Sequence, residues 1–441
     1  MMIVDKTFIF NLMIMLFLLF TFLLLGLKIH FTLYGVAFIA LKFLGKGDME
    51  GILGGLLFNC INSYTLVSLP LFILMGEILI KSNSSEPLFR GIKKILGPIP
   101  GGMLHSNIVA CSIFAACSGS SSATTLAVGG ISYPEMIKAG YDRKITLGSI
   151  AAGGTLGILI PPSLMMIIYG SLTQNSVGKL FIGGIIPGLL LAFLFMCWIA
   201  ISSFIFPSWV PKRKKYNENY FKGFLEGLKD VWPVVVLVIF IMGSIYGGFA
   251  TPTEAAAVAC VVAFLISTFI YKTMSLQIMK ESLEETAFLT SVLLICMIGA
   301  QAVSMALSML RIAQAISAFV IALTLDQYTI WAIMVFIYML IGCLIDGFDL
   351  LILTTPVFYP IIVGVLHFDP IWFGVVLVII IEMSLLSPPV GFNLFITHTI
   401  GGRKKLGDTI VGMLPFFICM VIMVILLTIF PSLVTYLPSK M

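Results

Sequence analysis

Two clusters of small and oxygen-bearing residues interrupt long apolar runs, one in each half of the chain. Residues 119–122 (Gly-Ser-Ser-Ser) form the first cluster and residues 346–349 (Asp-Gly-Phe-Asp) form the second. Hard cations such as Na⁺ prefer oxygen ligands, and an ionisable side chain at membrane depth marks a functional site by default. Both clusters are therefore candidate cation sites. In the alternative interpretation, an aspartate caps the following helix and the small residues merely permit close helix packing.

A Pro-Pro pair follows each cluster at the same distance along the chain. Pro161 lies 41 residues after Ser120, and Pro388 lies 41 residues after Gly347. Each pair removes two backbone N–H donors and clashes with the preceding turn, so a continuous helix cannot pass through it. Inside a membrane, a broken helix is tolerated only where it is buried in protein or lines a cavity. Corresponding breaks in two halves indicate the binding site of a secondary transporter.

The clusters and the breaks define two sets of candidate residues. Unwound carbonyls suit a cation, and the new helix N-termini carry a positive dipole end that suits a carboxylate. The candidate cation ligands are Gly119, Ser120, Ser121, Ser122, Thr155, Gly157, Asp346, Gly347, Asp349, Thr354, Ser387, Pro388 and Gly391. The candidate substrate-binding residues are Ser121, Thr124, Pro161, Pro162, Ser163, Pro389 and Asn393. No catalytic group and no transition-metal site are expected.

The composition indicates an integral membrane protein. Of the 441 residues, 60% are hydrophobic and 10% are charged, whereas soluble domains average about 45–50% apolar and about 25% charged residues. The apolar runs are continuous rather than alternating, which argues against a β-barrel and predicts an all-α polytopic membrane protein. The net charge of +5 comes from basic residues between spans. That pattern is typical of cytoplasmic loops and not of nucleic-acid binding.

The basic residues 212–215 predict a cytoplasmic loop that separates two halves of opposite orientation. Each half then contains a re-entrant hairpin (103–134 and 330–362), a broken helix (147–172 and 371–400) and a closing span (180–206 and 409–430). This inverted repeat, with two re-entrant hairpins and two broken helices, is typical of secondary transporters with a binding site at the bilayer midplane.

The predicted organisation has five parts. They are 1–102 (scaffold and arm helices of repeat 1), 103–206 (hairpin 1, broken helix and closing span), 207–232 (cytoplasmic linker), 233–329 (scaffold and arm helices of repeat 2) and 330–441 (hairpin 2, broken helix and closing span). The amphipathic segments 84–100 and 273–286 predict helices along the membrane interface. Residues 8–26 predict a retained first span rather than a signal peptide.

Three further acids lie in apolar surroundings. Glu254 follows Thr251, Pro252 and Thr253 and fits the start of a helix, since proline and acids favour the first turn. Glu77 and Glu382 are candidate pairing groups between helices.

At these positions the sequence resembles the large membrane (M) subunit of tripartite ATP-independent periplasmic (TRAP) transporters, of the DctM and SiaM type. The resemblance covers nearly the whole chain. It rests on Gly97-Pro-Ile-Pro-Gly-Gly102, Phe114-Ala-Ala-Cys-Ser-Gly-Ser-Ser121, Pro134-Glu-Met-Ile-Lys-Ala-Gly-Tyr-Asp142, Gly153-Gly-Thr-Leu-Gly-Ile-Leu-Ile-Pro-Pro-Ser163, Phe181-Ile-Gly-Gly-Ile-Ile-Pro-Gly188, Thr251-Pro-Thr-Glu-Ala-Ala-Ala257, Asp369-Pro-Ile-Trp-Phe-Gly374 and Pro388-Pro-Val-Gly-Phe-Asn-Leu-Phe395.

The resemblance implies an elevator-type fold in the bacterial inner membrane and Na⁺-coupled uptake of an organic acid such as a C4-dicarboxylate or sialic acid. It implies two partners, a small four-helix membrane (Q) subunit and an extracytoplasmic substrate-binding (P) protein. The Na⁺ sites would lie at 120–122, at 346–349 and at the two Pro-Pro breaks, with substrate between them. No four-span segment precedes residue 8, so the Q subunit is expected to be a separate chain. Na⁺ would be the coupling ion, and no other cofactor is expected.

Two other functions compete with this interpretation. One is a self-sufficient Na⁺/anion symporter that needs no binding protein. The other is an intramembrane protease using Ser120–Ser122, for which only His398 is a possible base, or using Asp346 and Asp349. The two acids lie three residues apart on one tip, whereas an aspartyl protease needs them on separate spans. A nucleotide-binding P-loop motif is absent from the sequence, so an ion gradient is the expected energy source.

Overall fold

A computed structural model describes residues 6–44, 49–211, 220–389 and 391–441. Every regular element in these ranges is helical, which confirms the predicted all-α class. The predicted basic loop at residues 212–215 lies outside the described residues.

The same order of elements occurs twice along the chain. Repeat 1 contains α4 (Tyr64–Lys81), α5 (Ser85–Leu96), the hairpin α6 (Gly102–Ser118) and α7 (Ser121–Lys138), the broken pair α8 (Arg143–Leu159) and α9 (Leu164–Thr173), and α10 (Val177–Ile205). Repeat 2 contains α13 (Leu276–Met309), α14 (Ile312–Ala322), the hairpin α15 (Gln327–Gly342) and α16 (Gly347–Tyr359), the broken pair α17 (Pro370–Leu386) and α18 (Phe392–Ile400), and α19 (Leu406–Ile429). A π-helical turn, Pro360–Val365, extends α16.

The other α-helices precede, connect or follow these repeats. They are α1 (Lys6–Leu24), α2 (Ile29–Ile39), α3 (Met49–Ile61), α11 (Tyr220–Tyr246), α12 (Pro252–Leu265) and α20 (Ser432–Thr435). Glu254 completes a capping box at the start of α12: the Thr251 amide donates to its carboxylate at 2.8 Å, and the Glu254 amide donates to the Thr251 hydroxyl at 3.3 Å. The predicted role of Glu254 at a helix start is confirmed.

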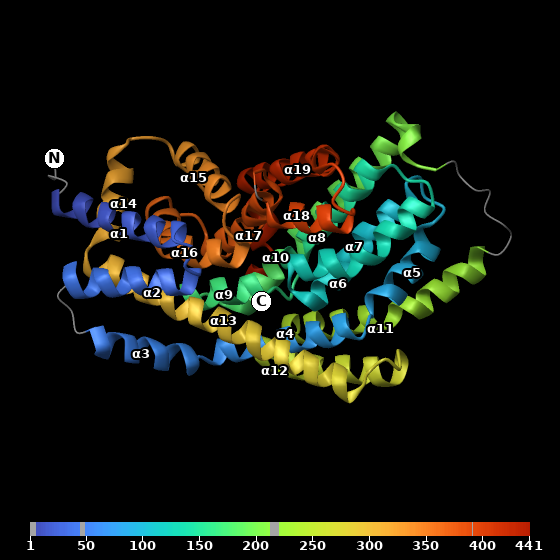
Figure 1. Ribbon diagram of the computed structural model, residues 1–441, viewed down its shortest axis with the longest axis horizontal. Coiled ribbons are helices and arrows are strands. Elements are labelled where there is room, and N and C mark those ends of the chain that lie inside the picture. Colours follow the sequence, from blue (N-terminus) through green and yellow to red (C-terminus); the bar gives the residue numbers. More distant parts are fainter. Residues whose placement is uncertain (1–5, 45–48, 212–219, 390) are drawn as a thin grey trace.

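The two hairpins approach the centre of the molecule from opposite sides. In Figure 1, α6 and α7 lie to one side of α9 and α17, and α15 and α16 lie to the other. The outer arms α6 and α15 have 17 and 16 residues, and at about 1.5 Å per residue each falls short of a roughly 30 Å hydrocarbon layer. The outer arm of each hairpin is therefore too short to cross the layer, whereas the second arm of hairpin 2 with its π-helical turn, Gly347–Val365, is long enough. Eight helices of the described part are long and apolar enough to span a bilayer.

One predicted segment is wrong. The segment 273–286 is not a separate interfacial helix, because α13 continues without a break from Leu276 to Met309 and no proline interrupts it. The short helix that precedes hairpin 2, as α5 precedes hairpin 1, is α14. Helix α13 ends at Met309, and Arg311, with φ 55°, directly precedes α14. The predicted linker 207–232 is helical from Tyr220 onwards, because α11 begins there.

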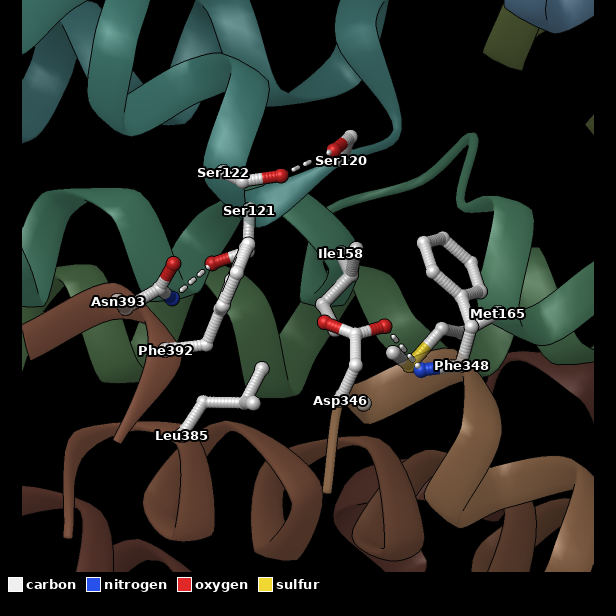
Figure 2. A pocket seen from close by; sticks show the side chains of 11 residues that line it. Ser120, Ser121, Ser122, Ile158, Met165, Asp346, Phe348, Leu385, Phe392 and Asn393 are labelled. Carbon is white, nitrogen blue, oxygen red and sulfur yellow. Dashed lines mark hydrogen bonds between the residues drawn. The ribbon is translucent and has the colours of Figure 1, made fainter. Parts of the chain in front are cut away.

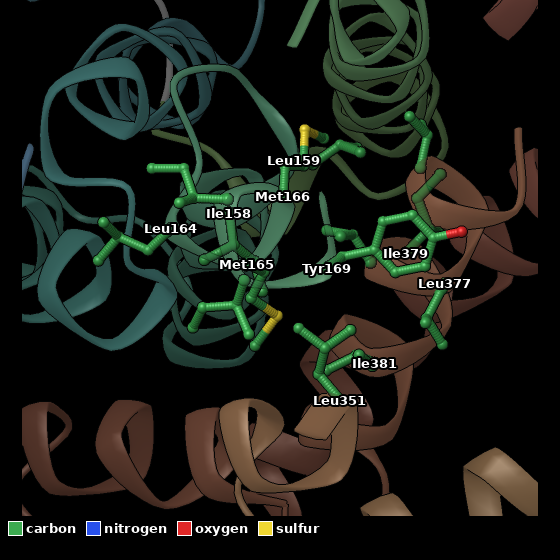
Figure 3. Packing of buried hydrophobic residues seen from close by; sticks show 14 of the residues in the cluster. Ile158, Leu159, Leu164, Met165, Met166, Tyr169, Leu351, Leu377, Ile379 and Ile381 are labelled. Carbon is green, nitrogen blue, oxygen red and sulfur yellow. The ribbon is translucent and has the colours of Figure 1, made fainter. Parts of the chain in front are cut away.

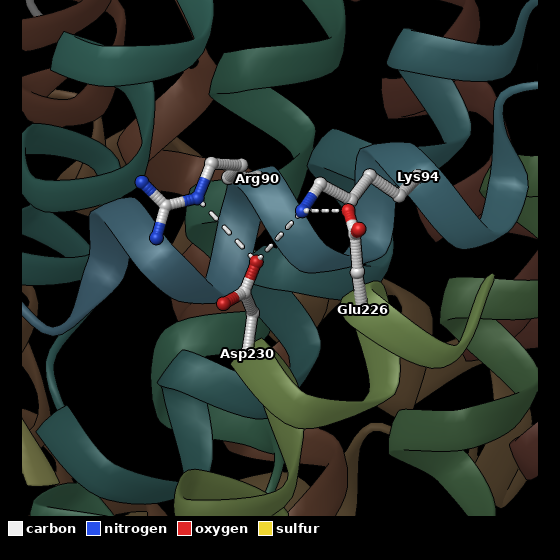
Figure 4. Close-up of polar contacts among 4 residues, drawn as sticks. All are labelled: Arg90, Lys94, Glu226 and Asp230. Carbon is white, nitrogen blue, oxygen red and sulfur yellow. Dashed lines mark hydrogen bonds and ion pairs between the residues drawn. The ribbon is translucent and has the colours of Figure 1, made fainter. Parts of the chain in front are cut away.

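Helix α5 is attached to α11 by ion pairs on its exposed side (Figure 4). Asp230 accepts from Arg90 Nε at 3.4 Å and from Lys94 Nζ at 3.4 Å, and Lys94 Nζ also lies 3.3 Å from Glu226. Gly91 and Gly227 pack backbone to backbone beneath them, since a Cβ on Gly91 would lie 2.7 Å from the Gly227 carbonyl oxygen. On its other side α5 reaches hairpin 1.

Helix α5 contacts hairpin 1 through an ion pair between Lys93 of α5 and Glu135 of α7. Helix α5 therefore lies between hairpin 1 and α11, with a charged contact to each. The predicted amphipathic helix at 84–100 exists, and its charged residues face neighbouring helices as well as the surface.

The closing helix α19 crosses α8 at two glycines. A Cβ on Gly412 would lie 1.9 Å from the Lys144 carbonyl oxygen, and one on Gly148 would lie 2.0 Å from the Gly412 carbonyl oxygen. Small residues allow this kind of close approach between membrane helices.

Alanine at Gly412 should destabilise the folded chain, because neither backbone can yield to the added methyl group. Overpacking of this kind typically costs about 1–3 kcal/mol. Thermal unfolding of the detergent-purified protein measures the effect. Gly407→Ala in the same helix is the matched control, since a Cβ there has no neighbour within 4 Å. Equal midpoints for the two variants would contradict the packing described here.

Candidate functional site

The two hairpin tips meet at a cavity near the centre of the molecule (Figure 2). The cavity is partly open to solvent. Its lining consists of Ser120, Ser121, Ser122, Ile158, Met165, Asp346, Gly347, Phe348, Leu385, Phe392 and Asn393. Residues from both repeats therefore line one cavity.

Six helix ends converge on this cavity. Four are N-terminal ends, represented by Ser121 of α7, Met165 of α9, Gly347 of α16 and Phe392 of α18. The C-terminal ends of α8 and α17 contribute Ile158 and Leu385. Helix N-termini attract anions, and the carbonyls of helix C-termini attract cations. The arrangement suits the simultaneous binding of an anion and a cation.

The N-terminal ends differ in how they are capped. Ser120 Oγ accepts from the Ala123 amide at 3.4 Å, and Ser163 Oγ accepts from the Met166 amide at 3.4 Å. Asp346 caps α16 by accepting from the Phe348 amide at 3.2 Å. The capping alternative therefore holds for Asp346. One of its carboxylate oxygens makes this bond, and the residue also lines the cavity.

Three buried polar side chains connect the repeats beside the cavity. Ser121 Oγ lies 3.1 Å from Glu382 Oε2, and Asn393 Nδ2 donates to the same Oε2 at 3.2 Å. Asn393 Nδ2 also donates to Ser121 Oγ, and Figure 2 shows these two side chains pointing at each other. The exposed fractions are 5% for Ser121, 1% for Glu382 and 0% for Asn393. The prediction of interhelical pairing is confirmed for Glu382.

The corresponding prediction for Glu77 is wrong. Glu77 lies 3.9 Å from Lys81 in its own helix α4, one turn further along. This local partner is available because residues four apart on a helix lie on the same face.

Hairpin 1 contacts the broken helix of its own repeat through glycines. A Cβ on Gly157 would lie 2.6 Å from the Ser120 carbonyl oxygen and 2.8 Å from Thr124 Oγ1. Gly119 has φ 59°, and a Cβ there would lie 3.3 Å from the Pro162 carbonyl oxygen. Gly157 and Thr124 thus support the first tip from behind rather than line the cavity.

Hairpin 2 contacts both repeats. The Gly391 amide donates to the Cys343 carbonyl at 3.3 Å, which fastens the turn of hairpin 2 to the second break. A Cβ on Gly347 would lie 2.7 Å from Met165 Cε of α9. The second tip therefore packs against a helix of repeat 1.

The two Pro-Pro breaks differ in burial. Pro161 and Pro162 are buried, whereas Pro388 and Pro389 are exposed in the described chain. The first break is covered by α10, where a Cβ on Gly184 would lie 3.2 Å from Pro161 Cγ. Neither proline pair lines the cavity. The prolines end the helices and so place the neighbouring helix ends around it.

Several candidate residues lie away from the cavity. Thr155 and Thr354 donate their hydroxyls to carbonyls of their own helices, those of Ala152 and Leu350. Ser163 and Ser387 also use their hydroxyls locally, and Asp349 is absent from the cavity lining. The structure thus brings together the serine cluster, Asp346, Gly347 and Asn393, and leaves the threonines outside.

Apolar side chains fill the space beside the cavity (Figure 3). Ile158 and Met165 of repeat 1 pack near Leu351 and Ile381 of repeat 2. Tyr169 of α9 donates its hydroxyl to the Pro370 carbonyl of α17 at 2.7 Å. Sequence patterns could not identify Ile158 and Met165 as lining residues, because an isoleucine or methionine in an apolar run carries no local signal.

A helical protein with two re-entrant hairpins, two broken helices and a shared central cavity belongs to the class of polytopic membrane transport proteins. Comparisons with known proteins specify the family. The family model described as the tripartite ATP-independent periplasmic transporter, DctM component, matches residues 16–433. The chain therefore belongs to the DctM family, the large permease subunits of TRAP transporters.

Individual relatives agree with this assignment. The C4-dicarboxylate TRAP transporter large permease protein DctM of Pseudomonas aeruginosa is 35% identical over 383 residues, covering 87% of this chain and 88% of that protein. The sialic acid TRAP transporter large permease protein SiaM of Vibrio cholerae is 29% identical over 428 residues, covering 94% and 95%. Because these relatives are permeases, the chain is a multi-pass protein of the bacterial inner membrane and not an enzyme.

A solved structure shares the fold. The YdaH transporter of Alcanivorax borkumensis superposes with a TM-score of 0.63 at 14% sequence identity, over 87% of this chain and 89% of that chain. At that identity the likeness concerns the architecture alone.

Proposed function

We propose that this permease subunit couples the inward movement of Na⁺ to the uptake of a small organic acid. A small membrane subunit and an extracytoplasmic binding protein that delivers the acid complete the transporter, as the tripartite family description implies. The observation that carries the proposal is the central cavity, at which helix N-termini and the acidic side chain of Asp346 lie together.

The charge of the cavity explains why a cation must accompany the acid. Among the described lining residues Asp346 is acidic and none is basic, and Glu382 lies directly behind Ser121. Any negative charge on these acidic groups would repel an organic anion that entered alone, because repulsion between charges a few ångströms apart costs several kcal/mol in a medium of low dielectric constant. A cation bound near the tips removes this penalty, and the helix N-termini then hold the anion.

The relatives indicate which organic acids to test first. The candidate substrates are those named for the relatives, a C4-dicarboxylate for the Pseudomonas aeruginosa protein and sialic acid for the Vibrio cholerae protein.

The transport movement we propose is of the elevator type. The hairpins, broken helices and α10 and α19 would move as one body against α3, α4 and α11 to α13. Helix α5 is placed to join the two bodies, since it carries ion pairs to hairpin 1 through Lys93 and to α11 through Lys94.

Uptake by proteoliposomes tests the proposal. The vesicles contain this chain with its small membrane subunit, and the binding protein is supplied outside with radiolabelled succinate or sialic acid. We expect uptake only with an inward Na⁺ gradient. The KM for the acid should fall by about tenfold or more between low and saturating Na⁺, within the usual range of coupling between two binding sites.

Two results would contradict parts of the proposal. Equal uptake with K⁺ replacing Na⁺ on both sides would exclude Na⁺ as the coupling ion. Full uptake without the binding protein would favour a self-sufficient symporter instead.

A further inference from the structure

The contact between Ser121, Glu382 and Asn393 joins the two repeats at the cavity. Ser121 comes from hairpin 1 of repeat 1, and Glu382 and Asn393 come from α17 and α18 of repeat 2. Ser121 and Asn393 line the cavity, whereas Glu382 does not. Glu382 therefore touches two lining residues from opposite repeats without facing the cavity itself.

The hydrogen bonds converge on one atom of Glu382. Oε2 lies within hydrogen-bond distance of both Ser121 Oγ and Asn393 Nδ2. Ser121 also approaches the Gly154 carbonyl oxygen at 2.9 Å. Because a serine hydroxyl has one hydrogen, these two acceptors compete for it. The Asn393 amide supplies two hydrogens, one to Ser121 and one to Glu382.

The group has more acceptors than donors. Glu382 Oε1 and Asn393 Oδ1 are buried and have no hydrogen-bond partner among the described residues. None of the ion pairs in the described part of the chain includes Glu382. Retaining a buried carboxylate among apolar side chains is costly. A hydrophobic residue of the same size would merely pack, so the carboxylate serves the two groups that it holds.

We propose that Glu382 is a positioning residue that links cation binding at hairpin 1 to substrate binding at α18, by holding Ser121 and Asn393 in one fixed relative orientation. The inference rests on the proposed function, together with the assignment from the sequence of Ser121 to the cation ligands and of Asn393 to the substrate-binding residues. Order imposed on Ser121 by a cation is transmitted through Oε2 to Asn393, and the reverse holds because coupling between two sites is reciprocal.

The first test measures this coupling directly. The KM for the acid that the wild type carries fastest is determined at low and at saturating Na⁺ in wild type, Glu382→Gln and Glu382→Leu. The ratio of the two KM values is the coupling factor. Glu382→Gln keeps an oxygen that can accept from both partners, so we expect a factor close to that of the wild type. Glu382→Leu should bring the factor close to one while the protein still transports.

Glu77→Gln is the matched control for the loss of a partly buried acid. Among the described residues, Glu77 has an ion-pair partner only in its own helix. The coupling factor of Glu77→Gln should therefore equal that of the wild type. Unchanged coupling in Glu382→Leu would overturn the proposal. Loss of all transport in Glu382→Gln, with normal folding, would also overturn it, because the charged carboxylate itself would then be required.

The second test exchanges the carboxylate and the amide. Asn393→Asp alone places two acids in contact and should reduce uptake strongly. Combining it with Glu382→Gln restores an amide donor facing a carboxylate, and we expect uptake to recover by about tenfold over the single variant, a coupling energy in the range seen for contacting residues. No recovery would contradict a pairing role.

The exchange experiment does not depend on the identity of the ion. If K⁺ or protons drive wild-type uptake, the proposed Na⁺ coupling fails, while rescue by the double variant still supports Glu382 as the link. If Na⁺ coupling holds and rescue is absent, the proposed function stands and the role of Glu382 is refuted.

Discussion

Alanine at Gly157 should abolish uptake while the chain still folds. The added Cβ would lie 2.6 Å from the Ser120 carbonyl oxygen and 2.8 Å from Ser121 Cα, both backbone atoms of the hairpin 1 tip. The tip must then move away from α8, and it takes the serine lining of the cavity with it. Overpacking costs about 1–3 kcal/mol, and each 1.4 kcal/mol lost from binding is about a factor of ten in affinity.

Gly130→Ala is the control for this substitution. Gly130 lies in α7 of the same hairpin, and a Cβ there has no neighbour within 4 Å. Alanine at such a helical position gains up to about 1 kcal/mol in helix propensity, so uptake should remain normal. Transport at the wild-type rate by Gly157→Ala would show that the tip does not need the close contact with α8.

Asparagine at Asp346 separates the two roles of this residue. Asparagine caps a helix about as well as aspartate, so α16 should keep its N-terminus and the protein its folding. The carboxylate charge at the cavity is lost, however. If this charge attracts the coupling cation, the Na⁺ concentration for half-maximal uptake should rise by about tenfold or more, since charged hydrogen-bond and ion contacts are worth about 1.5–3 kcal/mol.

Asp326 provides a matched control on the same hairpin. It caps α15 by accepting from the Thr329 amide at 2.9 Å, and it does not line the central cavity. Asp326→Asn should leave the Na⁺ dependence unchanged. If Asp346→Asn also keeps the wild-type Na⁺ dependence, Asp346 is only a cap, and the cation must bind to the serine tip and to carbonyl groups.

Local chemistry explains which parts of the fold could be predicted from the sequence. The helix breaks were predicted correctly because a proline pair acts on the helix that contains it, whatever surrounds it. The first hairpin turn was predicted because glycine commonly ends a helix and serine commonly caps the next one. Gly119 ends α6, and Ser120 caps α7. The continuity of α13 was missed because its charged first turns resemble a surface helix.

Long-range contacts explain what could not be predicted. Glu382 and Ser121 are separated by 261 positions, so no local pattern connects them. Helix α14 was missed because its sequence is largely apolar and gives no interfacial pattern. Thr155 and Thr354 were assigned to the site from their residue type. In a helix, however, a threonine hydroxyl readily donates to the carbonyl three or four residues earlier, as both do here.

The uncovered second proline pair has a consequence for the transport cycle proposed above. Equivalent positions in the two repeats have different surroundings, since α10 shields Pro161 while Pro388 and Pro389 are bare. In the elevator movement proposed above, the hairpins and broken helices of both repeats move as one body, so the two proline pairs would move together. In the opposite-facing state, repeat 2 would take up the surroundings that repeat 1 has here, so the second proline pair would be covered and the first would be exposed.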